Sequence, residues 1–186
     1  MANRLTKGQA LAGLVNTTTL KLNNAEVTAS AAELNKCDNI AATAYQVVAE
    51  EVTFTETTGA GTYTGSVTVP AGATIIDIKI ISTALWTAAS SATMKVGDVA
   101  DDDGWFTGIN LKATDLLVGE EINFVQTGGK EGAYLNLTTG ARSAAYSASA
   151  RVVSGIVTTV GASGSAGRSR MLVIYVLPTA SATTKA

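Results

Sequence analysis

Short runs rich in β-branched residues, set about ten residues apart and separated by Gly-, Thr- and Ser-rich stretches, dominate the chain from Gln46 to Leu177. Runs of this composition and length predict strands, and the stretches between them predict turns. The predicted strands cover residues 46–55, 62–70, 73–82, 92–97, 105–111, 120–126, 133–138, 147–160 and 170–177. This spacing predicts a mainly β fold, an antiparallel β-sandwich or jelly roll.

Two of these runs also predict which faces of their strands are buried. In residues 73–82, Ile76, Ile78 and Ile80 alternate with Asp77 and Lys79, which predicts one apolar and one polar face. The run from Arg170 to Leu177 is instead apolar at nearly every position. It is therefore expected to be a central strand, or a strand that another subunit covers.

The first 45 residues have a different pattern, with two short helix signals. In residues 6–15 and in residues 30–37, a Ser or Thr is followed three residues later by Gln or Glu and then by apolar residues, which is the pattern of a capped helix. Residues 16–24, between the two, predict an extended piece with an Asn-Asn turn. This segment has too few large apolar residues to form a core, so it should be ordered only by docking onto its own sheet domain, a sister subunit or another protein. We expect an N-terminal arm (1–45), a β-sandwich domain (46–178) and a flexible C-terminal tail (179–186).

Composition restricts the chemistry that the chain can perform. It contains no histidine and one cysteine, Cys37, which excludes a His-based triad, a His-ligated metal and an internal disulfide. The 13 basic residues do not outnumber the 15 acidic ones, so nucleic-acid binding is not expected. No apolar run approaches the ~20 residues that span a bilayer, and the start does not resemble a signal peptide. We therefore expect synthesis in a cytoplasm and no membrane partner.

Aromatic residues make up only 5% of the chain. A core of Val, Ile, Ala and Thr buries less apolar area than one rich in Leu and Phe, so a lone domain would be modestly stable. Association adds buried area, and symmetric assemblies are the usual form. The composition therefore favours a homo-oligomer.

The candidate sites are few. Four carboxylates at Asp98, Asp101, Asp102 and Asp103 could bind Ca²⁺, but their spacing does not fit an EF-hand, and a solvated acidic loop is the alternative. Trp86 and Trp105 could stack on a sugar or anchor a core. Carboxylate pairs at 77 and 98 or at 120 and 121 are poor candidates for acid–base catalysis, and the glycine-rich stretch 161–167 lacks a phosphate-loop ending. We expect no catalytic residue, no cofactor and no bound metal.

A short sequence motif near the N-terminus resembles one found in a known class of proteins. Residues Val27-Thr-Ala-Ser-x-x-Glu33-Leu34-Asn35 are similar to a phrase, roughly V-T-A-x-E-L-N-x-L-D-G, of virion structural proteins of tailed bacteriophages, such as head-decoration, head-fibre and tail-fibre proteins. Residues 36–39 depart from the usual Leu-Asp-Gly ending. A looser resemblance to β-rich phage structural proteins runs from residue 75 to residue 106.

The resemblance implies a non-enzymatic capsid decoration protein, of the cement or head-fibre type, on the capsid surface of the virion. Its implied partners are the major capsid protein and sister subunits, with a homotrimer expected by analogy. The alternative is a tail-fibre or baseplate structural protein involved in host recognition. In either case the arm is expected to supply the partner interface through its leucines: Leu5, Leu11, Leu14, Leu20, Leu22 and Leu34.

Overall fold

The computed structural model describes the backbone of residues 20–22 and 25–27, together with residues 45–59, 61–112, 114–136, 142–162 and 164–178. The predicted helices at 6–15 and 30–37, Cys37 and the tail from residue 179 lie outside the described residues. The described residues form strands and turns, and none of them belongs to a helix long and apolar enough to cross a membrane. The mainly β prediction is confirmed.

Strands β1 (Leu20–Leu22) and β2 (Ala25–Val27) pair antiparallel and belong to one unit of the chain. The pairing agrees with the extended piece predicted for residues 16–24. The second unit spans residues 44–179 and contains the other strands. These are β3 (Tyr45–Thr55), β4 (Thr62–Val69), β5 (Thr74–Ala84), β6 (Ser91–Gly97), β7 (Phe106–Asn110), β8 (Glu121–Ile122), β9 (Arg151–Val160) and β10 (Arg168–Pro178).

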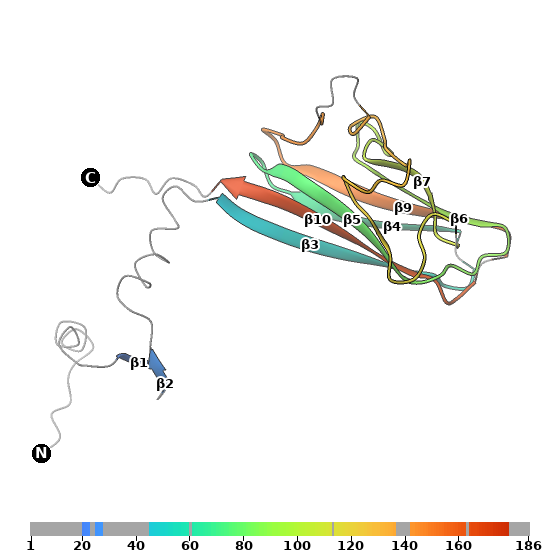
Figure 1. The fold of residues 1–186 in the computed structure, drawn as a ribbon, viewed down its shortest axis with the longest axis horizontal. Helices are drawn as coiled ribbons and strands as arrows, with labels where there is room; N and C mark the ends of the chain where they lie inside the picture. The colour runs from blue at the N-terminus through green and yellow to red at the C-terminus, as the bar shows by residue number, and fades with distance from the viewer. Residues whose placement is uncertain are drawn as a thin grey trace, which may run out of the picture. The chain divides into compact units, whose positions relative to one another are not determined.

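The second unit has two antiparallel four-stranded sheets, ordered β3-β10-β5-β8 and β4-β9-β6-β7 (Figure 1). Each strand of the first half pairs with its counterpart in the second half: β3 with β10, β4 with β9, β5 with β8 and β6 with β7. This is the strand order of a jelly roll, in which one long antiparallel ribbon is rolled into two layers. Side chains of both sheets join in one apolar core.

The apolar run 170–177 forms a central strand, as expected. Strand β10 lies between β3 and β5, and its inward residues Met171, Val173 and Tyr175 are buried. Between the sheets, the core depends on close approach as well as on bulk. A Cβ on Gly155 of β9 would lie 2.6 Å from the Phe54 ring and 2.7 Å from Met94. The lack of a side chain at 155 thus lets the two sheets pack closely.

The predicted face of residues 73–82 is wrong at one position. The pairing of β5 with β10 shifts between Ile174 and Tyr175, so that Ile76 has no partner residue across the ladder. This bulge turns Ile76 outward to 38% exposure and places Ile75 in the core with Ile78. Strict alternation cannot detect an inserted residue, because the sequence on each side of it continues with period two.

Three predicted strands are shorter or absent, and the mildest case is the strand expected at 147–160, which begins only at Arg151. The strand expected at 120–126 is reduced to β8, because the Asn123 carboxamide oxygen accepts hydrogen bonds from the N–H groups of Val125 and Gln126 and closes a turn. The strand expected at 133–138 is a turn over its described part. There the N–H groups of Leu135 and Asn136 both bond the carbonyl of Gly132.

A buried carboxylate joins three connections of the second unit. Glu56 follows β3 and is 1% exposed. Its two oxygens accept five hydrogen bonds, at 2.8–3.3 Å, from the N–H and hydroxyl of Thr87 and from the N–H groups of Ala88, Gly164 and Gly167. The β5–β6 and β9–β10 connections are thereby tied to the end of β3. The glycine-rich stretch 161–167, which lacks a phosphate-loop ending, supplies two of these donors.

The charge state of Glu56 follows from this cage. Burial raises the pKa of the Glu56 carboxyl, but the hydrogen bonds from Thr87, Gly167 and Ala88 outweigh burial and lower that pKa below its ordinary value of 4.5. The ionised form of Glu56 therefore stabilises the fold. Gly167 is also required by packing, since a Cβ there would lie 2.6 Å from the Trp86 ring.

We predict that Glu56→Gln lowers the free energy of unfolding by about 2–3 kcal/mol at neutral pH, because an amide nitrogen would face backbone donors. The folded pKa of Glu56 lies below the unfolded one, so its contribution is present above about pH 4.5 and is lost as pH falls through the folded pKa. The variant should therefore lose less stability on acidification. Urea titrations at several pH values measure both effects.

Glu120→Gln is the matched control for this prediction. Glu120 is exposed and accepts one backbone hydrogen bond, from Leu117. Its substitution should change stability by no more than about 0.5 kcal/mol. Equal losses in the two variants would contradict the role assigned to Glu56.

Candidate binding surfaces

The acidic residues of the predicted calcium loop lie between β6 and β7. One carboxylate oxygen of Asp98 accepts hydrogen bonds from the N–H groups of Ala100 and Asp101, at 2.9 and 3.2 Å, and from the Tyr134 hydroxyl at 2.9 Å. Asp102 forms an ion pair with Lys95. Asp98 and Asp102 thus both have partners that shape the loop itself.

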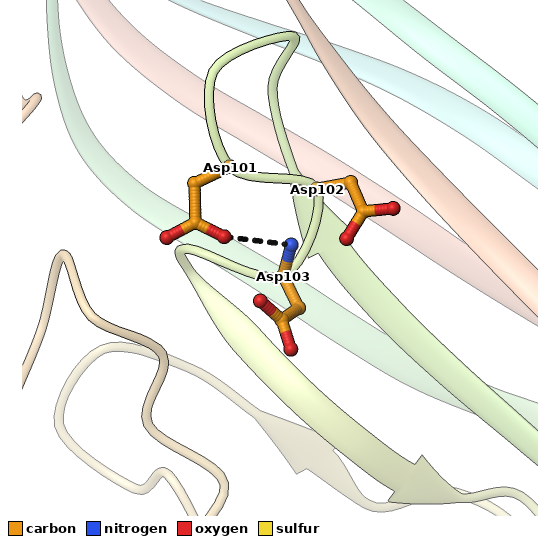
Figure 2. Close-up of side chains that lie close together, drawn as sticks. All are labelled: Asp101, Asp102 and Asp103. Atoms are coloured by element: carbon orange, nitrogen blue, oxygen red, sulfur yellow. Dashed lines mark hydrogen bonds between the residues drawn. The ribbon is translucent and has the colours of Figure 1, made fainter.

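The side chains of Asp101, Asp102 and Asp103 lie close together, with carboxylate oxygens within 4.8 Å of one another (Figure 2). The Asp103 N–H donates to the Asp101 carboxylate at 3.4 Å. A hydrogen bond with the Asp101 carboxyl, burial and the negative charges of Asp101 and Asp102 raise the pKa of Asp103. The cluster offers oxygen atoms, but the hydrogen bonds at Asp98 and the Lys95 ion pair account for the shape of the loop.

The acidic loop packs against an aromatic cluster centred on Trp105, for which the sequence offered anchoring a core as one of two possible roles. Trp105 is fully buried and stacks on Phe124 with ring centroids 5.1 Å apart, while Tyr134 meets it edge-on. Arg151 lies over the Trp105 ring at 5.7 Å and donates to the carbonyl of Ala145. Burial, and then the bond to Asp98, raise the pKa of Tyr134 to about 12. This tyrosine therefore remains a hydrogen-bond donor at any ordinary pH.

The other predicted site residues are not brought together. Trp86 is 2% exposed and donates from its indole nitrogen to the Ser169 hydroxyl at 2.9 Å, so both tryptophans belong to the core. Asp77 of β5 accepts the N–H of Phe124, whereas Asp98 follows β6 in the other sheet. Glu121 pairs with Lys79 at 2.6 Å. No pocket opens among the described residues.

The two sheets present different outer surfaces. On the sheet β4-β9-β6-β7, exposed positions of β4 are all hydroxyl-bearing: Thr62, Thr64, Ser66 and Thr68. On the other sheet, cross-strand rows join Val47 to Val176 and Ala49 to Ile174. Tyr45 and Val47 are 72% and 63% exposed. We call the outward residues Tyr45, Val47, Ala49, Leu172, Ile174 and Val176 the apolar face.

The leucines proposed as the partner interface are only partly described. Leu20 and Leu22 are in β1, at register positions opposite Val27 and Ala25 of β2. Leu5, Leu11, Leu14 and Leu34 lie outside the described residues. A hairpin of three residues per strand is marginal alone, so β1 and β2 need further contacts to be stable. The interface therefore stays a prediction, whereas the apolar face is a surface that sequence reasoning anticipated only as a two-sided strand.

Comparison with known proteins gives limited likeness. No family model and no curated protein matches the sequence. The chain is similar to a chain in the acidic stable capsid structure of Helicobacter pylori bacteriophage KHP30, at 17% identity and a TM-score of 0.45, covering 72% of this chain and 94% of that one. It is also similar to a chain of the Cyanophage Pam1 capsid asymmetric unit, at 20% identity and a TM-score of 0.42, covering 87% and 100%. Neither likeness by itself assigns a function.

We predict that the acidic loop is held by Asp98 rather than by a metal ion. Asp98→Ala removes three hydrogen bonds and should lower the free energy of unfolding by about 2 kcal/mol. Asp102→Ala, in the same loop, removes only a surface ion pair and should cost less than about 0.5 kcal/mol. Thermal unfolding with calcium or with a chelator should give the same Tm. A calcium-dependent rise in Tm that disappears in the Asp102 variant would contradict this account.

Proposed function

We propose that this chain is a structural protein of a tailed-phage virion that decorates the outer surface of the capsid, and that it catalyses no reaction. The observation that carries the proposal is the phrase from Val27 to Asn35, which resembles the N-terminal phrase of such proteins. The phrase precedes a jelly roll, a fold that viral capsid domains share with lectins and cupins. Since a fold alone does not assign a function, the distinction must come from surfaces.

The surfaces support adhesion over the other uses of the fold. Trp86 and Trp105 are buried, so neither offers a ring face to a sugar. The chain has no histidine for the metal ligation common in enzymes. What it presents instead is an extended apolar face and a leucine-bearing N-terminal segment. Extended surfaces of this kind suit contact with another protein better than capture of a small molecule.

In this proposal the arm attaches the protein to the shell and the jelly-roll unit is displayed by it. Leu5, Leu11, Leu14, Leu20, Leu22 and Leu34 bury against the major capsid protein or a sister subunit. Each contact can be weak, because a symmetric shell repeats it and avidity multiplies it. The homotrimer expected by analogy is untested by the structure, and the surface of the jelly-roll unit favours a two-fold pair in its place.

The number of copies in purified virions tests the location. A decoration protein should appear on a quantitative gel in a ratio to the major capsid protein that corresponds to hundreds of copies per particle. A handful of copies would instead favour the tail-fibre or baseplate alternative. Absence from finished particles would overturn the virion role.

We predict that deleting residues 1–40 abolishes binding to capsids that lack this protein and leaves the jelly-roll unit folded. The strands of that unit begin at Tyr45, and its core contains no described residue from before β3. Cosedimentation with capsids measures binding, and the far-UV circular dichroism and urea midpoint report folding. Full occupancy by the truncated protein would contradict the role of the arm.

A further inference from the structure

The apolar face continues into a polar half on the same side of the sheet. Beyond Ala49 and Ile174, the next outward row flanks Leu172 of the apolar face with Glu51 and Lys79, and Arg170 follows. Arg170 forms an ion pair with Glu51, and Lys79 pairs with Glu121 of β8. An apolar half and a charge-paired half thus share one surface, on the three long strands β3, β10 and β5.

The charges on this surface cancel. Its acidic residues are Glu51, Asp77 and Glu121, and its basic residues are Lys79, Arg168 and Arg170. A strongly acidic or basic partner would therefore gain little there. An identical surface would not be repelled, and ion pairs at its rim can exchange between two copies.

The size of the surface also indicates its occupant. Three strands about 4.8 Å apart and 11 residues long, at about 3.3 Å per residue, present about 500 Å². A standard stable interface buries about 800 Å² on each partner, so this surface suits a reversible contact between two folded domains. The outer surface of the other sheet is more mixed: β4 contributes only hydroxyl-bearing residues, and the exposed Val152 and Val160 lie near opposite ends of β9.

We propose that a second copy of this chain packs on this surface, with the apolar face at the centre of the contact, so that two jelly-roll units meet through β3, β10 and β5 and give a two-fold pair. Val47, Ile174 and Val176 form the centre of the contact, and Glu51 with Arg170 forms its rim. The contact is isologous, with the same surface used by both copies. This inference does not depend on a place in the virion.

The test is sedimentation equilibrium of the full-length chain between about 1 µM and about 1 mM, the range of weak specific contacts. The wild-type chain should convert reversibly from monomer to dimer. Val47→Glu places an unpaired charge in the contact of both copies and should weaken dimerisation at least tenfold. Val47→Lys should do the same, because identical charges repel whatever their sign. Val47 is 63% exposed on an edge strand, so both variants should fold.

Val152→Glu is the matched control. Val152 is a valine 44% exposed on a strand of the opposite sheet, and its substitution should leave the dimer unchanged. A monomer at every concentration, a trimer, or a dimer insensitive to Val47→Glu would overturn the proposal. If Val47→Glu leaves the mass unchanged but removes hydrogen-exchange protection in residues 20–27, the chain's own N-terminal segment occupies the face, and the proposal is wrong. A result against the pair leaves the copy-number test of the capsid role unaffected.

Discussion

The jelly-roll unit depends on one ionised carboxylate that is buried where three connections meet. Without Glu56, the N–H groups of Thr87, Ala88, Gly164 and Gly167 would lose their acceptors, and an unsatisfied buried donor costs about 1–3 kcal/mol. A rolled ribbon brings these connections to the end of β3 from positions up to 111 residues apart. The ladders already bring the ends of β3, β5 and β10 together, since Arg168 pairs with both Thr55 and Ala84. The carboxylate fixes the β5–β6 and β9–β10 connections that continue from those ends.

Much of the fold could be predicted from alternation and composition, because strands of a two-layer β fold record their buried side in the sequence. The run from Arg170 to Leu177 indicated a central strand, and β10 is central. The failures have a common cause. The bulge at Ile76, the turn made by Asn123 and the cage around Glu56 all depend on which backbone groups meet, and side-chain pattern does not report that. For the candidate sites, the sequence showed that carboxylates cluster at 98–103. It did not show that the Asp98 carboxylate accepts hydrogen bonds from Tyr134 and from its own loop.

The outer surfaces of the two sheets differ in polarity. Strand β4 alternates hydroxyl-bearing residues outside with Val67 and Val69 inside, which leaves its outer side compatible with water. Strand β10 is apolar on both sides, so its inward residues stabilise the unit while Ile174 and Val176 remain partly exposed. A strand that is apolar on both sides is costly for an isolated domain unless something covers it. The contrast between β4 and β10 therefore gives one sheet a continuous apolar face, while the only large apolar residues that the other sheet exposes are the separate valines Val152 and Val160 of β9.

Low aromatic content links the core to the way in which such a chain can work. With aromatics at 5%, the core gains density from close approach, as at Gly155, and its large rings gather around Trp105 and Trp86. A unit built in this way has limited apolar area to bury within itself, and association adds to it. Weak contacts that repeat in an ordered assembly then supply the affinity that no single contact has. We therefore expect the isolated unit to be modestly stable, and this expectation and the extended contact surfaces both suit a protein whose proposed role is to bind other proteins in many copies.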